Sequence, residues 1–315
     1  MGTVLVTRTL PDGGIDPLVA AGHEVVARPD DEPWTAAELA AVAGDVDGIV
    51  CLLTDRIDSE VLQRGATGRL RVVANVAVGY DNIDVAAATA AGVTVCNTPG
   101  VLDDTTADLA LLLMLAAARL ASTAEADLRS GRWDGWSITG YLGRDVHHTT
   151  VGLVGYGRIG RAVAARAAGF GMEVGHTTRT DTGVPGWTPS LNDLLDRSDF
   201  VSLHVPLTAA TRHLIGPAEL ARMGPDAVLV NTARGPVVDE EALAVALEAG
   251  TIFAAGLDVF EAEPAIHPRL LAAPRTVLLP HIGSATTATR TLMAHRACEG
   301  VDDVLAGRTP RFAVV

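Results

Sequence analysis

The sequence feature that most constrains the fold is a glycine-rich stretch near the middle of the chain, Val151-Gly-Leu-Val-Gly-Tyr-Gly-Arg-Ile-Gly160. An apolar run meets a turn with the spacing G-x-G-x-x-G, and the turn opens an Ala- and Arg-rich segment of helical character. In this context Gly155 allows the tight turn, Gly157 lets the backbone approach a pyrophosphate, and Gly160 lets the helix pack on the strand. The N-terminus of that helix offers free N–H groups to phosphates. The stretch predicts a dinucleotide-binding turn, although three glycines at this spacing also occur in ordinary turns.

The rest of the chain alternates short apolar runs with helix-like segments, which is typical of parallel α/β sheets covered on both faces. At 315 residues the chain is long enough for about two such domains. In the first half we expect strands at residues 3–7, 24–27, 48–52, 70–74 and 92–96, with helices at 33–43, 58–64 and 84–91. In the second half we expect strands at 173–176, 200–204, 227–231, 254–258 and 276–279, a helix at 239–249 and a last helix at 287–305. The pattern predicts an α/β fold with two doubly wound parallel sheets.

Between the two halves the sequence predicts one long helix from about Leu102 to Leu128. Its nearly continuous apolar stretch indicates burial on all sides, in part against a second subunit. A loop over residues 129–143 follows and carries Trp133, Trp136 and Tyr141. Aromatic side chains on a long loop indicate a partner surface or a lid. They could equally serve only to hold the loop in place.

Composition excludes several classes of function. All 24 basic residues are Arg, so Schiff-base and lysine-nucleophile chemistry is excluded, and a net charge of −14 argues against a nucleic-acid surface. The longest apolar run, residues 109–118, is too short to span a bilayer, and no signal peptide opens the chain, so we expect a cytoplasmic protein. Cys51, Cys96 and Cys298 lack metal-ligand spacing; we expect core residues and no metal site.

Three polar residues follow the carboxyl ends of expected strands in the second half: Arg234, Glu263 and His281. Ligands of open α/β sheets bind at such ends. Arg offers a planar fork to a carboxylate, and His can donate a proton near neutral pH when a carboxylate holds it charged and oriented. Each residue alone could be a salt-bridge, loop or helix-capping residue. Together, beside a nucleotide site, they predict reduction of a carbonyl compound that bears a carboxylate.

Several longer blocks carry a resemblance to a known family. They are Asn231-Thr-Ala-Arg-Gly235, Gly256-Leu-Asp-Val-Phe260 with Glu263-Pro264, and Pro280-His-Ile-Gly-Ser284, with further blocks at residues 75–84, 97–100 and 204–208. These blocks resemble the signatures of the D-isomer-specific 2-hydroxyacid dehydrogenases, in the right order and nearly end to end. Within the family, residues 133–136 and 141–143 look most like the glyoxylate/hydroxypyruvate reductases.

The resemblance implies roles for these residues. Arg234 binds the substrate carboxylate, Glu263 partners the histidine, and His281 is the acid/base. The backbone N–H groups of Val78 and Gly79 also bind the substrate. The cofactor-binding positions that it implies are Thr106, Gly155, Gly157, Arg158, Ile159, Gly160, Thr178, Arg179, Thr180, Val205, Pro206, Thr211, Thr232, Ala233, Asp258 and Gly283, with Asp258 at the nicotinamide carboxamide.

The resemblance also implies an organisation. Residues 1–98, completed by 287–315, form a flavodoxin-like substrate domain, and residues 99–286 form a Rossmann nucleotide domain, with the active site in the cleft between them. The family further implies a homodimer. One position departs from the family pattern: Asp108 stands where a Glu is expected after Thr105-Thr-Ala107, which shortens a side chain without an expected loss of activity.

The choice of nicotinamide cofactor depends on the strand after the fingerprint. An NAD site needs an Asp or Glu about 20 residues beyond the fingerprint, to accept from the ribose 2′-OH. Here that position is Thr178, followed by Arg179 and Thr180, and the nearest acid is Asp181. A hydroxyl followed by Arg suits a 2′-phosphate. The segment predicts NADP(H) as the preferred cofactor, with NAD(H) as the alternative.

Together these features predict an enzyme that reduces a small 2-ketoacid, glyoxylate or hydroxypyruvate, to the 2-hydroxy acid, the D-isomer where chiral. The alternative from another class is a non-catalytic NAD(P) sensor like the corepressors built on this fold. A phosphoglycerate-type dehydrogenase is disfavoured because we expect no added regulatory domain in a chain of this length, and a formate dehydrogenase is disfavoured by Glu263, where that branch has a Gln. The sequence does not rank the 2-ketoacids against one another.

Overall fold

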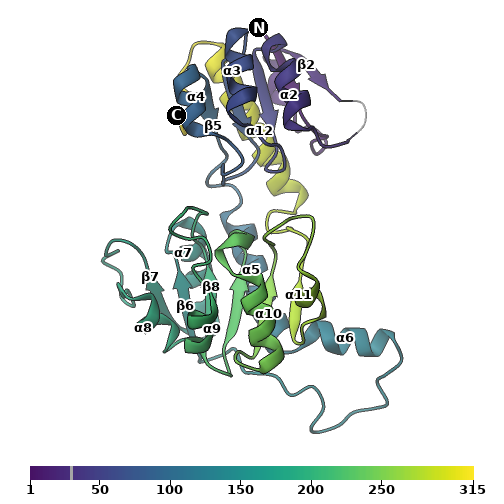
Figure 1. The fold of residues 1–315 in the computed structure, drawn as a ribbon, viewed down its shortest axis with the longest axis vertical. Coiled ribbons are helices and arrows are strands. Elements are labelled where there is room, and N and C mark those ends of the chain that lie inside the picture. The colour runs from purple at the N-terminus through teal and green to yellow at the C-terminus, as the bar shows by residue number, and fades with distance from the viewer. Residues whose placement is uncertain (29–30) are drawn as a thin grey trace. The chain divides into compact units, whose positions relative to one another are not determined.

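The computed structural model describes residues 1–28 and 31–315 of the chain (Figure 1). The chain divides into two compact units, which are described separately. Unit 1 comprises Met1–Leu102 with Ser284–Val315, and unit 2 comprises Asp103–Gly283. The predicted limits near residues 98 and 287, and the role assigned to each domain, stay predictions.

Unit 1 contains a five-stranded parallel sheet with the order β2-β1-β3-β4-β5. This is the flavodoxin-like order of a doubly wound sheet. The strands are β1 (Thr3–Val6), β2 (Glu24–Ala27), β3 (Gly48–Cys51), β4 (Val72–Asn75) and β5 (Thr94–Cys96). β3 and β4 are buried along their whole length, because helices cover both faces of a parallel sheet.

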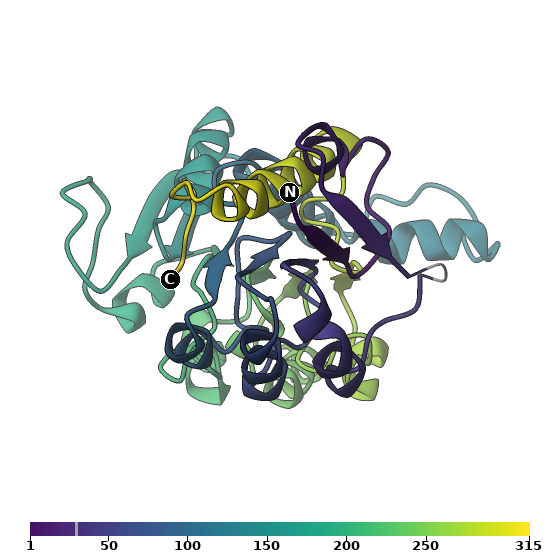
Figure 2. The ribbon, with the colours of Figure 1, turned by 90° about the horizontal axis from the view of Figure 1, so that it is seen from above.

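Two apolar layers enclose this sheet (Figure 2). Leu39, Leu62 and Ala88 bring one set of helices onto one face, and Leu18 and Val301 bring the other set onto the opposite face. The first set is α2 (Ala36–Val42), α3 (Ser59–Thr67) and α4 (Val85–Ala91), and the second is α1 (Asp16–Ala20) and α12 (Thr287–Leu305). Four of these five helices begin after a side chain that caps them: Thr35 for α2, Asp58 for α3, Asp84 for α4 and Thr286 for α12.

Unit 2 contains a six-stranded parallel sheet with the order β11-β10-β9-β8-β6-β7. The strands are β6 (Thr150–Val154), β7 (Glu173–Thr177), β8 (Phe200–Leu203), β9 (Val228–Asn231), β10 (Ala254–Leu257) and β11 (Thr276–Leu278). A parallel bridge between His176 and Trp187 extends the sheet beyond β7. The strand order reverses between β6 and β8, which is where open α/β sheets bind ligands. The predicted fold class, two doubly wound parallel α/β sheets, is therefore confirmed.

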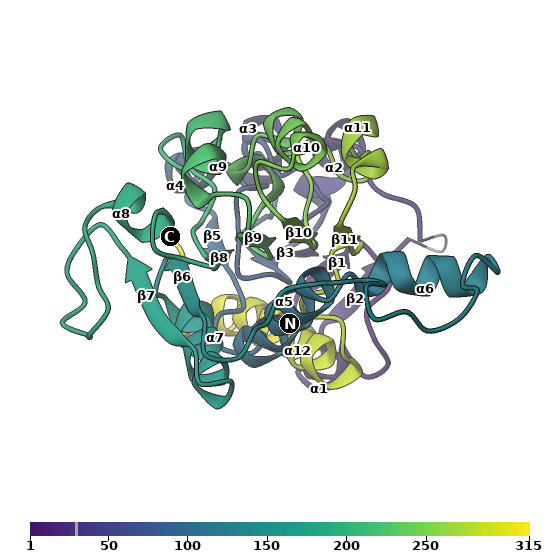
Figure 3. The ribbon, with the colours of Figure 1, turned by 90° about the horizontal axis from the view of Figure 1, so that it is seen from below.

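Helices cover both faces of the second sheet as well (Figure 3). Helices α5 (Asp103–Ala118) and α7 (Arg158–Gly169) pack on one face through residues such as Met114 and Val163. On the other face Leu195, Leu220, Leu247 and Leu270 bring in four further helices. These are α8 (Leu191–Leu195), α9 (Pro217–Met223), α10 (Glu240–Ala249) and the short α11 (Pro268–Ala272).

The prediction of one helix from Leu102 to Leu128 is wrong. α5 ends at Ala118, and α6 (Ala121–Arg129) departs from it at 67°. The Ala118 carbonyl, which a continuing helix would bond to the N–H of Ser122, instead accepts from the N–H of Arg144 at 2.8 Å. Leu120 takes a left-handed backbone conformation, with φ of 54°. The expected burial on all sides is also wrong, because α6 has no buried residue.

No single helix that the structure describes is long and apolar enough to cross a membrane. The bent pair α5 and α6 passes such a test by length and composition alone, and eight residues of α5 are buried in unit 2.

Candidate active site

The glycine-rich turn lies between β6 and α7 in unit 2. Gly155 has φ of 97°, and a Cβ there would lie 2.5 Å from the carbonyl oxygen of His204. A Cβ on Gly160 would lie 2.5 Å from the Gly155 oxygen, so helix and strand approach as closely as glycine allows. Gly157 precedes the first turn of α7 and has open space where its Cβ would be. The turn therefore leaves the α7 N-terminus accessible to a phosphate group.

The strand next to the turn supplies a neutral histidine. Burial lowers the pKa of His204 to about 4, and its Nε2 lies 2.9 Å from the Ser202 hydroxyl. Beyond His204 the chain forms a tight loop that the Thr211 side chain closes. Its Oγ1 donates to the Pro206 carbonyl at 2.6 Å and accepts from the N–H of Thr208 at 2.8 Å. Of the cofactor positions predicted here, Val205 approaches the turn, because its Cγ1 would lie 3.1 Å from a Cβ on Gly155.

The segment after β7 carries no acid at the position that an NAD site requires. The Thr178 hydroxyl donates to the Thr180 carbonyl at 2.6 Å and accepts from Trp187 Nε1–H at 3.1 Å. Asp181 is turned to its own loop, where it accepts from the N–H of Gly183 at 2.8 Å. Arg179 is exposed and forms no ion pair within residues 1–28 and 31–315. The only charged side chain at positions 178–180 is therefore that of Arg179.

The turn after β9 presents Arg234. Asn231 clamps this turn: its Nδ2–H donates to the Arg234 carbonyl at 2.9 Å, and its Oδ1 accepts from the N–H of Ala233 at 3.0 Å. A Cβ at Gly235 would lie 1.9 Å from the carbonyl carbon of Phe260. Only glycine fits there, so the Arg234 turn packs directly on the backbone that leads to Glu263.

Asp258, after β10, organises the turn that carries the histidine. Its carboxylate is buried and accepts from the N–H groups of Ile282 and Gly283 at 2.7 and 2.8 Å, and its carbonyl accepts from the N–H of His281 at 2.9 Å. Burial raises the pKa of Asp258, while these two N–H groups oppose that rise. The Thr106 hydroxyl donates to the Gly283 carbonyl at 3.4 Å. Asp258 thus has a positioning task, beside the predicted contact with nicotinamide.

Glu263 and His281 form the pair that the sequence predicts. His281 Nδ1 lies 2.8 Å from Glu263 Oε2, and Glu263 Oε1 accepts from the N–H of Phe260 at 2.9 Å. Burial raises the pKa of Glu263, but the hydrogen bond and charge of His281, the Phe260 N–H and the charge of Arg234 together lower it below its usual value. An ionised carboxylate only accepts, so Nδ1 carries a hydrogen and Nε2 remains for the substrate.

The remaining predicted residues fall in two places. Arg234, Glu263 and His281 come together at the ends of β9, β10 and β11 in unit 2, whereas Val78 and Gly79 follow β4 in unit 1. Two of the unit 2 residues have notable surroundings. The Thr232 hydroxyl is buried without a partner in the described part of the chain. Asp108, the departure from the family pattern, pairs with Arg166 of α7 at 2.5 Å.

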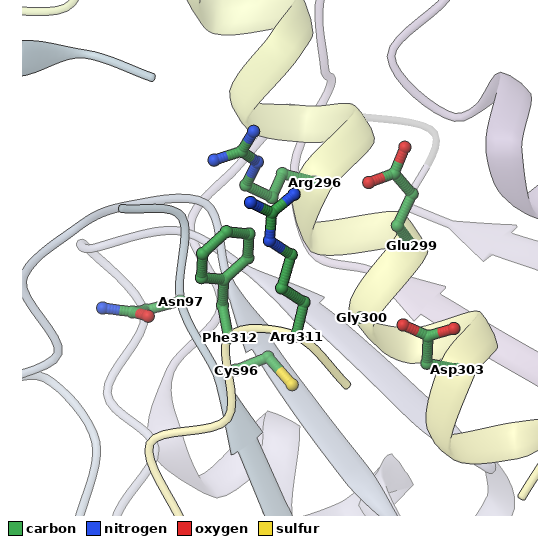
Figure 4. Close-up of a pocket in the computed structure, with 8 residues that line it drawn as sticks. All are labelled: Cys96, Asn97, Arg296, Glu299, Gly300, Asp303, Arg311 and Phe312. Atoms are coloured by element: carbon green, nitrogen blue, oxygen red, sulfur yellow. The ribbon is translucent and has the colours of Figure 1, made fainter. Parts of the chain in front are cut away.

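Sequence reasoning assigned no role to two side chains near Val78 and Gly79. Asn75 and Asn97 end β4 and follow β5, and their amides bond to the carbonyls of Gly79 and Val78. Their positions at strand ends were the available signal. A cavity of about 60 Å³ lies beside Asn97, lined also by Arg296 and Phe312 (Figure 4). Ligand pockets hold about 300–1,000 Å³, so this cavity is too small for a dinucleotide.

Comparison with known proteins shows to which family the chain belongs. Residues 111–283 match the family described as "D-isomer specific 2-hydroxyacid dehydrogenase, NAD binding domain". The chain is 43% identical to a glyoxylate reductase of Thermococcus litoralis and 46% identical to one of Korarchaeum cryptofilum. These matches cover 98% of this chain and 93% and 94% of the two relatives.

Solved structures agree. An NADPH-dependent glyoxylate/hydroxypyruvate reductase of Sinorhizobium meliloti, in complex with NADP and malonate, matches with a TM-score of 0.88 at 36% identity, over 99% of this chain and 96% of that one. The TT0316 protein of Thermus thermophilus matches with a TM-score of 0.93 at 45% identity, over 99% of this chain and 100% of that one. With the fingerprint, the Arg234 turn and the Glu263–His281 pair on the same sheet, these matches lead to one conclusion: the chain belongs to the D-isomer-specific 2-hydroxyacid dehydrogenases.

Proposed function

We propose that this protein reduces a small 2-ketoacid, glyoxylate or hydroxypyruvate, to the 2-hydroxy acid, with NADPH as the preferred reductant. The observation that carries the proposal is the Glu263–His281 pair, whose atoms Oε2 and Nδ1 lie 2.8 Å apart. The positive charge of Arg234 helps to lower the pKa of Glu263 in this pair. The three residues lie at neighbouring strand ends of the sheet that also carries the dinucleotide turn. Relatives at 43–46% identity are glyoxylate reductases, which supports the same substrate class.

The residues of unit 2 fit a dinucleotide. The turn at Gly155, Gly157 and Gly160 forms a cradle that side chains would fill, and the buried hydroxyl of Thr232 offers a polar atom that no described protein group satisfies. Arg158 and Ile159, in the first turn of α7, would face the pyrophosphate. The nicotinamide cofactor, when bound, supplies the hydride.

The protein's own residues then supply binding and the proton. Arg234 anchors the substrate carboxylate and stabilises the negative charge that develops on the carbonyl oxygen. His281 gives that oxygen its proton from Nε2, while Glu263 holds Nδ1–H and orients the ring. In the reverse direction the neutral ring takes the proton back.

The preference for NADPH rests on Thr178, Arg179 and Thr180. None of these positions carries a carboxylate, which would repel a 2′-phosphate. Arg179 can pair with such a phosphate. The relative from Sinorhizobium meliloti is described as NADPH-dependent and was solved with NADP, which supports the same choice for this chain.

We further propose a homodimer that uses α6 and the following loop. Leu128, Trp133, Trp136, Ile138 and Leu142 are all at least half exposed, and Trp136 is 80% exposed. Loop and helix are joined by a hydrogen bond from the Tyr141 hydroxyl to Asp127, 3.1 Å long. Apolar side chains gathered on one segment are typical of a surface that another protein covers.

Steady-state kinetics test the function and separate it from the rival sensor. We expect oxidation of NADPH with glyoxylate and hydroxypyruvate, with kcat/KM higher for NADPH than for NADH. Pyruvate and bulkier 2-ketoacids complete the panel. A protein that binds NADPH but oxidises it with none of these acids would be a sensor, and the proposal would be wrong.

A further inference from the structure

The loop after β4 has its carbonyl groups tied down one after another. The Ala77 carbonyl accepts from the N–H of Thr98 at 2.9 Å, and the Val78 carbonyl accepts from Asn97 Nδ2–H at 2.8 Å. The Gly79 carbonyl accepts from Asn75 Nδ2–H, also at 2.8 Å. Three consecutive peptide groups of unit 1 are therefore fixed from the side of the β4 and β5 strand ends.

Anchoring these carbonyls also sets the direction of three N–H groups. The peptide bonds of this loop are trans, so each C=O points opposite to the N–H of the next residue. The N–H groups of Val78, Gly79 and Tyr80 thus point away from their anchors. In the described part of the chain no protein oxygen accepts from any of the three. Successive N–H groups that turn to one side form a concave anion site.

The two anchoring amides are themselves held firmly. Asn75 is fully buried, its Nδ2–H also donates to Asn82 Oδ1 at 3.0 Å, and its Oδ1 lies 3.5 Å from the Cys51 thiol. The N–H of Asn97 donates to the carbonyl of Phe312 at 3.3 Å, in the C-terminal segment that pairs with β5. Figure 4 shows the Asn97 amide directed away from the side chains of Arg311 and Phe312. The main chain of Asn97 is thus bonded to the C-terminal segment, while its side-chain amide is bonded to the loop after β4.

We propose that Asn97, supported by Asn75, is a positioning residue that aims the N–H groups of Val78, Gly79 and Tyr80 at the substrate carboxylate. The inference rests on the proposed function, because it names the groups that recognise the 2-ketoacid. It adds the Tyr80 N–H as a third donor and gives both asparagines a task. Asn97 acts through the backbone and touches no reacting atom.

The test is Asn97→Ala, with Phe312→Ala as the matched control. Both truncations fall at the same corner of unit 1, but only the first removes a donor to the loop. We expect Asn97→Ala to raise KM for glyoxylate and the inhibition constant of oxamate, a carboxylate that is not reduced, by about tenfold. The kcat should change by less than about threefold, and the Kd for NADPH and all constants of Phe312→Ala by less than about twofold. Asn97→Ser, polar but too short to reach the loop, carries the same expectation should the alanine variant not fold.

Unchanged KM and oxamate inhibition in Asn97→Ala, with an active wild type, would overturn the inference. Equal losses in Phe312→Ala would overturn it too, because they would indicate a general loosening of this corner. A wild type that reduces no 2-ketoacid would instead overturn the proposed function. Calorimetric titration of oxamate into wild type and Asn97→Ala then decides the anion site by itself: about tenfold weaker binding to the variant supports it, and equal binding overturns it.

Discussion

His281 adopts a left-handed backbone conformation, with φ of 54°, which few residues other than glycine and asparagine adopt. Such a conformation costs on the order of 1–3 kcal/mol and persists only where the surroundings fix it. Here the Asp258 carbonyl accepts from the His281 N–H, and the Asp258 carboxylate accepts from the next two N–H groups. The strain is thereby held in place where the imidazole must meet both Glu263 and the substrate.

This backbone conformation selects the best variant for testing the acid. Asn tolerates the left-handed region, so His281→Asn should keep the turn while removing the proton donor. We expect kcat for glyoxylate reduction to fall roughly 10²–10⁴-fold, the usual contribution of a positioned acid. The Kd for NADPH, measured by fluorescence titration, should stay within about twofold. A folded His281→Asn variant that retains most of its kcat would contradict the role of His281.

The sequence predicts Arg234, Glu263 and His281 as site residues because each follows a strand end, and the carboxyl ends of parallel strands share one edge of a sheet. It assigned no role to Asn97 or Asn75. An amide side chain acts through the group that it reaches, and the direction of the Val78 and Gly79 carbonyls depends on backbone angles that no residue pattern specifies. Asp258 was predicted as a cofactor contact, but its hold on the next turn is visible only in three dimensions.

At the scale of elements, we propose that the segment after β7 determines cofactor choice. Replacing Thr178 by Asp and Arg179 by Ala should remove a charge-assisted contact to the 2′-phosphate and add a repulsion. We expect the double variant to shift the preference toward NADH by on the order of 2 kcal/mol, which is about thirtyfold in the ratio of kcat/KM values. Steady-state kinetics with both cofactors measure it. A wild type that already favours NADH would contradict the assignment.

His204, which follows β8 beside the dinucleotide turn, leads to a prediction about stability. The folded protein binds a proton at His204 only near pH 4, whereas the unfolded chain binds one near the ordinary histidine pKa of 6.5. Between these two pKa values the unfolded chain binds more protons than the folded protein. The contribution of the neutral His204 ring to the free energy of unfolding is therefore fully present above the pKa of the unfolded chain, and it decreases as pH drops toward 4. We expect this loss to reach on the order of 2 kcal/mol and to be absent in His204→Gln.

Urea unfolding at about pH 7 and about pH 4.5 checks this prediction. The free energy of unfolding should decrease more for wild type than for His204→Gln over this interval. Equal decreases in the two proteins would show that His204 takes up its proton in the folded state as readily as in the unfolded one.

The predicted helix over residues 102–128 shows where element prediction fails. Nothing in the Ala-rich sequence near residue 118 marks a helix end, because no Gly or Pro lies there. The helix ends because a distant segment takes its last carbonyl: the N–H of Arg144 bonds to Ala118, and a side chain at Gly143 would collide with the same oxygen. Such a tertiary competitor cannot be read from local pattern.

At the scale of the whole molecule, the pattern of strands and helices was sufficient for the fold class. The strands that form the two sheets were all expected from their apolar runs, and no observed strand end differs by more than two residues from the expected range. Parallel strands buried on both faces have no polar alternation to blur the signal, and each is followed by a helix start. The strand order within each sheet does not follow from these runs, because order depends on how helices pack across the faces.

Assembly is the second property of the whole molecule. We expect light scattering to give about 65 kDa, twice the chain mass of 32.6 kDa, at micromolar concentration. Trp136→Ser should shift the protein toward monomer, because it removes the most exposed aromatic side chain of the loop. Val19→Ser, at an exposed apolar residue of α1, should leave the mass unchanged. A wild type that scatters as one chain would contradict the proposed dimer.

The pH dependence of the reaction in both directions tests the central claim, which is that the Glu263–His281 pair transfers the proton. The pKa of Glu263 lies below its usual value, so its carboxylate stays charged well into the acid range and is lost only as pH falls through that lowered pKa. Reduction needs the protonated ring, so its rate should decrease as pH rises. Oxidation of glycolate needs the neutral ring and should show the opposite limb.

The most direct measurement is the pH dependence of kcat/KM for glyoxylate reduction in wild type and in Glu263→Gln. The variant keeps the shape of the side chain but removes its charge, so the ring loses its proton more readily. Because a neighbouring negative charge favours the protonated ring, the account predicts that the falling limb moves to lower pH. A limb that stays where it is in Glu263→Gln would show that another group donates the proton, and the central claim would be wrong.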